Sequence, residues 1–351
     1  MTILISLIRS SFEFFFMLVK KMPIIVKKIF LALFFFFNFS LLQANPVNFN
    51  LWLDNFKITA KKEGISQKTI EDALSDVQYI SKVIEYDNRQ PEFFEKTDVY
   101  ISKRANKRAI DQAVILLKEN QNIFNKVEKE FNVNKEILLA LWSTETNFGK
   151  NLGKMDIISS LATLSFDKRR SAYFTNELIT LLKLLDSQTI KKDTLYGSWA
   201  GAVGNFQFMP SSVANYAIDY DKDGYIDLKQ SKLDAIGSAA NYINKIGWKK
   251  NMPCFDKVNF SKDISSKYFN YSARNISNKK KVSNWKKIGI NFIDQDENKN
   301  NYLAALVLPD GDNTSPKFLV YDNYEIILKW NRSLRFALSV CTLAESIKNE
   351  I

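Results

Sequence analysis

The chain has 351 residues, of which 46% are hydrophobic and 25% are charged. These proportions are those of a folded globular protein, and the length allows two or three compact units. The sequence contains no histidine, which excludes Ser-His-Asp and Cys-His catalysis and any histidine-ligated zinc site. The formal net charge of +11 suits an anionic wall polymer or a membrane surface. No nucleic-acid-binding motif is present, so we expect no nucleic-acid partner.

Residues 1–44 are typical of a targeting segment. With either Met1 or Met22 as the start, two lysines precede an apolar run over residues 29–42, and Ala44 supplies a small residue at the cleavage position. We therefore expect a signal peptide and a periplasmic protein. The alternative is an uncleaved segment that anchors the chain at the inner membrane. No cysteine lies near the cleavage position, so the segment has no lipobox.

Short helices are predicted over most of the following 90 or so residues. Residues 45–90 have the spacing of short helices, and residues 101–131 have that of one or two amphipathic helices with lysines on the solvent face. The segment Pro91–Tyr100 predicts a break between them. The expected core contacts of the first segment are Trp52, Phe56, Ile70 and Leu74.

A short helix over residues 134–149 carries the first candidate for chemistry. Asn134 can cap its start, and Gly149 can end it. Three apolar residues recur at the i, i+3, i+4 spacing of one buried face, namely Leu138, Leu141 and Trp142. Glu145 continues that face, so a carboxylate stands where the pattern requires an apolar side chain.

Two physical effects are expected to act on Glu145. Burial and the negative end of the helix dipole both disfavour the ionised form, so both raise the pKa of this carboxyl. A carboxylic acid that stays protonated near neutral pH can donate a proton to a glycosidic oxygen. The structural alternative is an ion pair between Glu145 and Arg169 or Arg170.

The least ordinary stretch is 197–212, which reads GSWAGAVGNFQFMPSS. It holds three of the chain's 11 glycines, and its apolar residues follow neither the helix period nor the strand period. We interpret it as a loop whose backbone something approaches closely, with a tight packing crossover as the alternative. Pro210 is expected to begin the next helix.

An acidic loop follows, with the spacing of an EF-hand-type calcium site. Asp219, Asp221 and Asp223 occupy its first, third and fifth positions, with a glycine at the sixth. Tyr225 would offer its backbone carbonyl at the seventh. The twelfth position is a glutamine, so Asp234 in the following helix is the candidate for the last carboxylate. The alternative is a solvated acidic turn.

The C-terminal third changes character twice. A helix over residues 234–247 carries Tyr242, and residues 255–321 then alternate in places as strands do, around a turn at Pro309–Asp312. Residues 322–351 return to helix, which is broken at the sequence W-N-R-S.

The chain has two cysteines, Cys254 and Cys341. In an oxidising periplasm they could form a disulfide bond, but two buried thiols fit the sequence equally well. The sequence leaves this question open.

Five motifs occur in order: the Glu-Thr-x-x-Gly helix end, paired arginines before Phe-x-x-Glu-Leu, GSWAGAVGNFQFMPSS, the acidic loop with DAIGSAANY, and W-N-R-S. Over residues 98–344 the chain thereby resembles the lytic murein transglycosylase B family, glycoside hydrolase family 103. The resemblance implies a mainly α (α+β) fold with a lysozyme-like core. The expected units are the targeting segment (1–44), an N-terminal helical subdomain (45–115), the catalytic core with the acidic loop (116–253), a small β-rich subdomain (254–321) and C-terminal helices that return to the core (322–351).

The resemblance also implies an activity. The expected enzyme cleaves the MurNAc-β-1,4-GlcNAc bond of peptidoglycan and forms 1,6-anhydro-MurNAc. Glu145 would be the single acid/base, which protonates the leaving oxygen and then deprotonates the 6-hydroxyl of MurNAc. The alternatives are a hydrolytic muramidase on the same scaffold and a non-catalytic peptidoglycan-binding protein.

Other site residues are implied by their match to family positions. The implied substrate-binding residues are Ser198, Gln207, Tyr242, Asn331, Arg169 and Arg170. The first two would line the cleft, the next two would position the sugar and the carboxyl group, and the arginines would contact glycan or peptide stem. Trp330 stands where the family usually has tyrosine, so stacking is kept and a hydroxyl is lost.

The match to the family's cation loop implies a structural calcium ion. Its ligands would be Asp219, Asp221, Asp223, Tyr225 and Asp234. No cofactor is expected for the chemistry. The expected partners are peptidoglycan glycan strands and other proteins of cell-wall synthesis or hydrolysis, and we expect a monomer.

Overall fold

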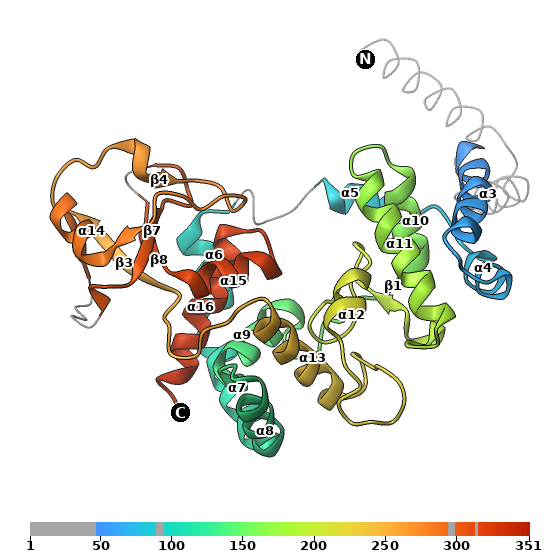
Figure 1. Ribbon diagram of the computed structural model, residues 1–351, viewed down its shortest axis with the longest axis horizontal. Coiled ribbons are helices and arrows are strands. Elements are labelled where there is room, and N and C mark those ends of the chain that lie inside the picture. Colours follow the sequence, from blue (N-terminus) through green and yellow to red (C-terminus); the bar gives the residue numbers. More distant parts are fainter. Residues whose placement is uncertain (1–46, 89–94, 294–298, 313–314) are drawn as a thin grey trace, which may run out of the picture. The chain divides into compact units, whose positions relative to one another are not determined.

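The computed structural model describes residues 47–88, 95–293, 299–312 and 315–351 (Figure 1). The predicted signal peptide lies outside these residues. Within them no helix is both long enough and apolar enough to cross a membrane. This part of the chain is mainly helical, with a two-stranded and a six-stranded sheet.

The helices of the first third follow the predicted apolar spacing. Their bounds are α3 Val47–Lys62, α4 Gln67–Leu74, α5 Ser81–Asp87, α6 Thr97–Arg104, α7 Lys107–Glu119 and α8 Gln121–Phe131. Three of the four predicted core residues, Phe56, Ile70 and Leu74, are buried. The fourth, Trp52, is half-buried and stacks on Phe56 with ring centroids 5.4 Å apart.

Two predictions for this region are wrong. The break expected over 91–100 ends early, because α6 already begins at Thr97. The segment after it contains α7, α8 and the end of α6, where one or two helices were expected. Asn106 separates α6 from α7: it is the N-cap of α7, and its side-chain oxygen accepts the backbone N–H of Ala109.

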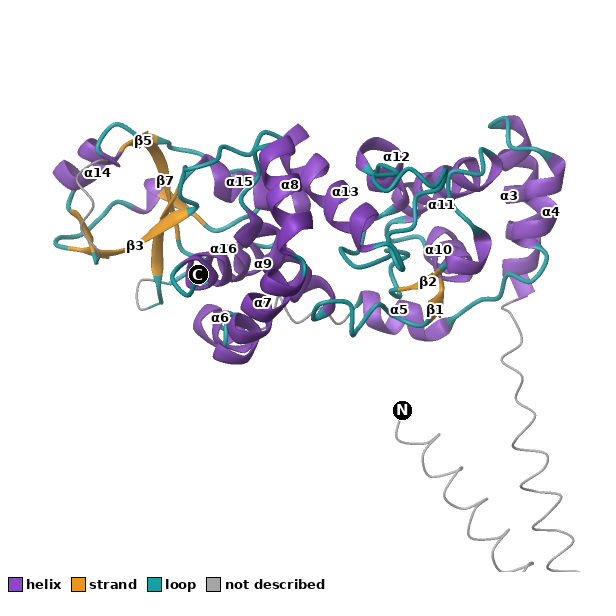
Figure 2. Ribbon diagram, turned by 90° about the horizontal axis from the view of Figure 1, so that it is seen from below, coloured by secondary structure: helices purple, strands orange, loops and turns teal. Residues whose placement is uncertain are grey.

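The central and C-terminal helices include α9, which carries Glu145. Their bounds are α9 Lys135–Thr146, α10 Ile157–Phe166, α11 Ser171–Asp186, α12 Pro210–Tyr216, α13 Lys232–Lys245, α15 Asp322–Trp330 and α16 Leu334–Lys348. Helix α16 packs along α9, α6 and α7, and it lies beside α9 in Figure 2. The start of α12 at Pro210 and the break between α15 and α16 confirm the sequence predictions.

A small sheet follows α13 and has its own core. Its elements are β3 Phe255–Phe260, β4 Phe269–Asn270, β5 Lys280–Lys281, α14 Val282–Ile288, β6 Ile290–Phe292, β7 Leu303–Val307 and β8 Lys317–Val320. The strand order is β4-β7-β8-β3-β6, with β5 also paired to β7. The predicted hairpin is confirmed: β7 and β8 are antiparallel, with Leu306 opposite Leu319. Trp285 of α14 is fully buried in this core and donates its indole N–H to the carbonyl of Ala304 at 2.8 Å.

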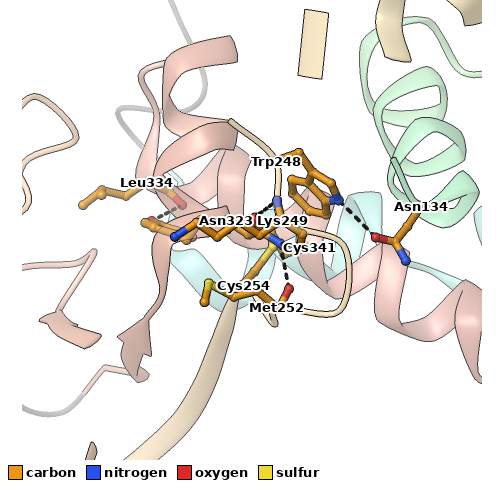
Figure 3. The surroundings of a disulfide bond; sticks show 9 residues. Asn134, Trp248, Lys249, Met252, Cys254, Asn323, Leu334 and Cys341 are labelled. Atoms are coloured by element: carbon orange, nitrogen blue, oxygen red, sulfur yellow. Dashed lines mark hydrogen bonds between the residues drawn. A yellow bond between two sulfur atoms is a disulfide. The ribbon is translucent and has the colours of Figure 1, made fainter. Parts of the chain in front are cut away.

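A disulfide bond joins this sheet to the helical core (Figure 3). Cys254 directly precedes β3, Cys341 lies in α16, and their Cα atoms are 6.1 Å apart. The question that the sequence left open is therefore answered in favour of the disulfide. Beside it, the side chain of Asn323 in α15 bonds the backbone of Lys249 and Met252. The linker from α13 to β3 is thus bonded to α15 through Asn323 and to α16, which packs on α9, through the disulfide.

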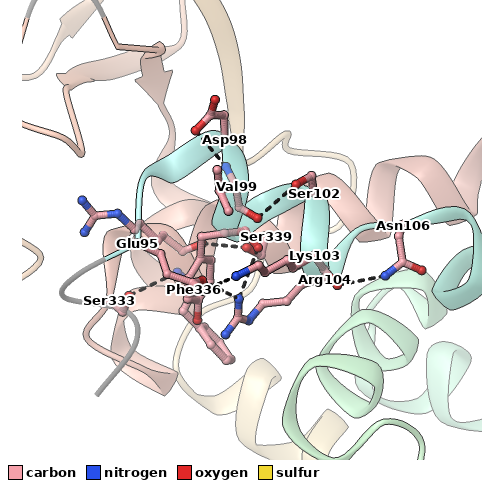
Figure 4. Close-up of polar contacts among 12 residues, drawn as sticks. Glu95, Asp98, Val99, Ser102, Lys103, Arg104, Asn106, Ser333, Phe336 and Ser339 are labelled. Atoms are coloured by element: carbon pink, nitrogen blue, oxygen red, sulfur yellow. Dashed lines mark hydrogen bonds and ion pairs between the residues drawn. The ribbon is translucent and has the colours of Figure 1, made fainter. Parts of the chain in front are cut away.

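Asp310, in the turn after β7, fixes the unexpected start of α6. Its carboxylate accepts the backbone N–H and the hydroxyl of Thr97, and it pairs with Arg335 of α16 at 2.7 Å. Figure 4 shows neighbouring contacts of α6, including the ion pair between Glu95 and Lys103. A partner 213 residues away supplies the cap, so local sequence could not reveal where α6 begins.

Opposing effects set the pKa of Asp310. Burial raises it, but the hydrogen bonds from Thr97 and the pair with Arg335 lower it by more, so the net pKa lies below its usual value. A carboxyl with a depressed pKa stabilises the fold above its unfolded pKa of about 3.9. That contribution is lost as the pH falls through the folded-state value.

We expect Asp310→Asn to lower the free energy of unfolding by about 2–4 kcal/mol near pH 7, because Arg335 loses its charged partner in a largely buried site. The difference in the free energy of unfolding between this variant and the parent protein should become smaller below about pH 4, because Asp310 of the parent protein loses its charge as the pH falls. Urea unfolding at a series of pH values measures both. The exposed Asp98→Asn in α6 is the control, and a gap independent of pH would contradict this account.

Candidate active site

Glu145 lies in the last turn of α9, on the face that the sequence predicted. Leu138 and Leu141 are fully buried on that face, and Trp142 is 3% exposed. Asn134 is the N-cap, as predicted, but its side-chain oxygen accepts the indole N–H of Trp248 instead of capping the helix. Glu145 itself is half-buried, so its carboxyl can meet a ligand from solvent.

The helix ends earlier than predicted. Its last residue is Thr146, and the C-cap Asn147 has a left-handed backbone with φ of 49°. Phe148 and Gly149 are also left-handed, so three consecutive residues turn the chain away from the helix axis. Gly149 is required for another reason: a Cβ there would lie 2.5 Å from the side-chain oxygen of Asn205.

An aromatic cluster lies beside Glu145. Its members are Trp142, Phe206, Phe208, Tyr216, Tyr242 and Trp330. The indole N–H of Trp330 donates to Oε1 of Glu145 at 2.8 Å. Trp330 stacks on Tyr242 with centroids 4.7 Å apart, and Tyr242 stacks on Tyr216 at 4.0 Å. Burial raises the pKa of Tyr242, so this ring stays neutral across the range in which a carboxyl titrates.

Asn205 joins the end of α9 to the end of the acidic loop. Its side-chain oxygen accepts the indole N–H of Trp142 at 2.9 Å, and its carbonyl accepts the hydroxyl of Thr146 at 2.7 Å. Its amide donates to the carbonyls of Leu228 and Lys229, both at 3.0 Å. The residue is 6% exposed, so these bonds form away from competing water and fix both residues that flank the turn of Glu145.

Glu177 fixes the other end of the glycine-rich stretch. This carboxylate of α11 is 1% exposed, and its two oxygens accept the backbone N–H and the hydroxyl of Ser211 at 2.8 and 2.7 Å. Ser211 is in the first turn of α12, whose unpaired N–H groups favour an anionic partner. The buried carboxylate therefore caps a helix.

Other residues of the protein pack closely against the glycines of the stretch 197–212. A Cβ at Gly197 would lie 2.2 Å from the carbonyl oxygen of Ala202, and one at Gly204 would lie 2.5 Å from Leu228. The close approach expected from the sequence is therefore internal, and the packing-crossover alternative describes these glycines. Each is needed so that the loop can fold tightly against its neighbours.

The acidic loop brings three of its predicted ligands together. Carboxylate oxygens of Asp219, Asp221 and Asp223 lie within 4.8 Å of one another, which suits a hard cation that takes oxygen ligands. Asp234 has a different environment: it is 1% exposed, and its carboxylate accepts backbone N–H bonds from Tyr220, Asp221 and Asp227. These bonds hold the loop closed around the three aspartates.

Comparison with known proteins places this geometry in a family. Residues 48–345 match the family described as "Transglycosylase SLT domain". The chain belongs to this transglycosylase family. Over 316 residues it is 28% identical to the membrane-bound lytic murein transglycosylase B of Escherichia coli (strain K12), across 87% of this chain and 83% of that one.

Solved structures of similar proteins agree. SltB3 from Pseudomonas aeruginosa in complex with NAG-NAM-pentapeptide has a TM-score of 0.78 and 31% identity, over 86% of this chain and 80% of that one. The Escherichia coli lytic transglycosylase Slt35 in complex with calcium has a TM-score of 0.70 and 27% identity, over 88% and 94%. The expected family, the mainly helical lysozyme-like fold and the enzyme class of lytic transglycosylases are confirmed.

In this transglycosylase the two arginines have a partner of their own. Arg169 and Arg170 both form ion pairs with Asp87 at the end of α5. Their side chains remain 47% and 41% exposed. The structural alternative for Glu145 was an ion pair with one of these arginines. The structure pairs both of them with Asp87 instead, so that they join α5 to the start of α11.

The remaining predicted residues lie in or next to the loops around the aromatic cluster. Ser198 closes a turn in which its hydroxyl oxygen accepts the N–H of Ala202 at 3.0 Å. Gln207 has a left-handed backbone, and its amide donates to the carbonyl of Gly204 at 3.0 Å. Asn331 ends α15 directly after Trp330. The antiparallel pair of β1 (Met155–Asp156) and β2 (Tyr196–Gly197) holds the segment before Ser198 in place.

Sequence reasoning missed Asn205 and Glu177. Each had a signal: Asn205 is a polar residue inside an apolar, glycine-rich run, and Glu177 stands on the buried face of α11 between Phe174 and Leu181. Neither signal names a partner, because the partners come from segments distant in sequence.

We expect Asn205→Leu to lower the free energy of unfolding by about 3 kcal/mol, because the carbonyl of Lys229 and the indole N–H of Trp142 lose their bonds to the Asn205 side chain in a buried site. The carbonyl of Leu228 keeps its bond from the backbone N–H of residue 205. The matched control is Asn215→Leu, an exposed asparagine of α12, for which a change within about 0.5 kcal/mol is expected. Urea unfolding of both variants makes the comparison. Equal effects would show that Asn205 is not a structural junction.

Proposed function

We propose that the chain is a lytic transglycosylase that cleaves the MurNAc-β-1,4-GlcNAc bond of peptidoglycan and leaves a 1,6-anhydro-MurNAc end. The observation that carries the proposal is Glu145, a half-buried carboxyl at the end of α9, hydrogen-bonded to Trp330 beside the aromatic cluster. The relatives support it: one is named a lytic murein transglycosylase, and SltB3 has been solved with NAG-NAM-pentapeptide and NAG-anhNAM-pentapeptide.

One carboxyl is enough for this reaction. Glu145 gives its proton to the glycosidic oxygen as the bond from that oxygen to C1 of MurNAc breaks. The resulting carboxylate then takes the proton of the MurNAc 6-hydroxyl as O6 bonds to C1. Glu145 ends in its starting form, and no water is consumed. A hydrolase would instead need a second carboxylate to act on water or sugar.

The surroundings of Glu145 agree with a single acid/base. Glu177, a buried carboxylate that binds the end of the glycine-rich stretch, has both oxygens bonded to Ser211. A carboxylate that caps a helix in this way is not available to activate water. This favours the transglycosylase reaction over the hydrolytic alternative.

The substrate contacts follow from the same arrangement. Aromatic faces such as that of Tyr242 suit the apolar faces of sugar rings. We assign Ser198 and Gln207 to hydrogen bonds with sugar hydroxyl or N-acetyl groups, and Asn331 to positioning of the sugar next to Trp330. The exposed edges of Arg169 and Arg170 would meet the anionic peptide stem.

The substrate also defines where the protein acts. Peptidoglycan lies outside the inner membrane, so we propose a periplasmic protein that is exported by the N-terminal segment. A disulfide bond between Cys254 and Cys341 fits an oxidising compartment of this kind. The partner that this proposal requires is the glycan strand itself.

Mass spectrometry of muropeptides tests the reaction. We expect purified residues 45–351 to release anhydro-MurNAc products from peptidoglycan sacculi, and Glu145→Gln to reduce the rate by at least about 10³-fold, because the amide cannot transfer a proton. Glu136→Gln, in the first turn of the same helix, is the control and should stay active. Products heavier by one water would identify a hydrolase, and an active Glu145→Gln would remove this residue from the chemistry.

We further propose that the acidic loop binds a structural calcium ion. Asp219, Asp221 and Asp223 fit such an ion by their charge and proximity, with the carbonyl of Tyr225 as a fourth ligand. The buried carboxylate of Asp234 accepts three backbone N–H groups of the loop. These bonds would keep the backbone of the loop in the shape that brings the ligands together. The ion would stabilise the loop and take no part in bond cleavage.

Calcium should raise the melting temperature of the purified protein by about 5 °C when its concentration is about 100 times the dissociation constant, because only the folded loop gathers the ligands. Asp223→Asn should lose most of this shift. Asp193→Asn, an exposed aspartate of the short helix Lys192–Thr194, is the matched control. A shift that survives in Asp223→Asn would place the ion elsewhere.

A further inference from the structure

Trp330 makes an unusual kind of contact with the proposed acid/base. Its indole Nε1–H points at one oxygen of Glu145, with 2.8 Å between Nε1 and Oε1. An indole N–H can only donate, and it does not ionise in the range in which proteins fold. A phenol or a carboxyl at this place could exchange its roles as donor and acceptor, but the indole cannot. Oε1 is therefore held as an acceptor.

We propose that Trp330 is a positioning residue that reserves Oε1 of Glu145 as the acceptor oxygen, so that Oε2 carries the proton in both halves of the reaction. This inference rests on the proposed function. In a neutral carboxyl group the C=O oxygen accepts a hydrogen bond more readily than the protonated oxygen does. A fixed donor at Oε1 therefore places the proton on Oε2.

With the proton on Oε2, only one path is left for it in the reaction. In the first half, the proton on Oε2 passes to the glycosidic oxygen as the bond to C1 breaks. In the second half, Oε2 takes the proton of the 6-hydroxyl as O6 bonds to C1. The indole bond to Oε1 persists in both halves and strengthens while Glu145 is charged, since hydrogen bonds to ionised groups are the stronger ones. Trp330 thus stabilises the carboxylate that exists between the two halves.

The rings around Trp330 keep its N–H aimed at Glu145. Tyr242 stacks on one face at 4.7 Å with an interplanar angle of 26°, and Phe208 lies edge-on at 5.5 Å and 88°. Phe206 also lies edge-on to Trp330, and it stacks on Trp142 of α9. The contacts therefore form a closed circuit from α9 through Trp142 and Phe206 to Trp330, and back to α9 at Glu145. Such a circuit holds the indole in the orientation that positioning requires.

Two substitutions at Trp330 separate its N–H from its ring. Trp330→Phe keeps an aromatic face for Tyr242 and removes the donor, whereas Trp330→Tyr supplies a donor again. We expect Trp330→Phe to lower kcat by about 10- to 100-fold with KM changed less than about threefold. The reason is that the variant lacks the hydrogen bond to Glu145, and this bond is strongest while Glu145 is a carboxylate, between the two half-reactions. Trp330→Tyr should recover most of the loss.

Trp248→Phe is the matched control. Its indole also donates to a residue of the α9 region, the oxygen of Asn134 at 3.0 Å, but at the opposite end of the helix. This variant should keep kcat near the parent value. Equal losses in Trp248→Phe and Trp330→Phe would overturn the proposal, because they would reflect a general effect on α9. A change confined to KM would also overturn it, because Trp330 would then only bind sugar.

A measurement that needs no activity gives an independent answer. The indole ¹H–¹⁵N resonance of Trp330, assigned by its loss in Trp330→Phe, should move as pH is varied through the titration of Glu145, and should stop moving in Glu145→Gln. Besides Glu145, the phenol of Tyr242 from α13 stacks on this ring, and Tyr216 from α12 stacks on Tyr242. Both are phenols, which ionise near pH 10 and stay neutral in the carboxyl range.

The two tests also distinguish failure of this inference from failure of the proposed function. If the parent protein leaves sacculi intact while the Trp330 resonance follows Glu145, the positioning contact stands and the proposed reaction is wrong. If the parent protein forms anhydro products while the resonance ignores Glu145 and Trp330→Phe keeps its kcat, the positioning inference is wrong and the reaction stands.

Discussion

The position of Glu145 depends on how Asn205 holds the end of α9. The helix gives up its regular path after Thr146, and three left-handed residues turn the chain. The turn is closed by bonds of its own, among them those from the N–H groups of Asn147 and Phe148 to the carbonyls of Ser143 and Trp142. It also has partners from outside the helix. Asn205 supplies them, with bonds to Trp142 and Thr146 on one side and to the carbonyl of Leu228 on the other. The turn after Glu145 and the end of the acidic loop are thereby bonded to the same residue.

Helix α9 is also held by α16, which has attachments of its own. Helix α16 packs along α9, and the disulfide from Cys341 fixes the start of the sheet to the same helix. Asp310 adds a third attachment, because it binds both Arg335 of α16 and the start of α6. These links join a small sheet with a core of its own to the helix that packs on α9. The sheet is linked to α16, and α16 packs on α9, the helix that carries Glu145.

Much of the fold could be predicted because its signals are local. The buried face of α9, the start of α12 at Pro210, the hairpin of β7 and β8, and the spacing of the three loop aspartates all depend on residues close together in the chain. The start of α6 was missed because its cap is Asp310. The close approach to the glycines was predicted, but the groups that make it, Leu228 and Ala202, were not. The predicted rise in the pKa of Glu145 stays a prediction.

By itself the sequence determined the helical periodicity, the carboxyl on a buried face, the acidic loop and the family, because spacing along one segment carries each of these. Only the tertiary structure decided which groups meet. Trp330 reaches Glu145 across 185 residues, Arg169 and Arg170 turn to Asp87, and the cysteines pair. The physical reason is that a hydrogen bond or an ion pair acts over about 3–4 Å. The partner is therefore fixed by packing, which no local pattern records.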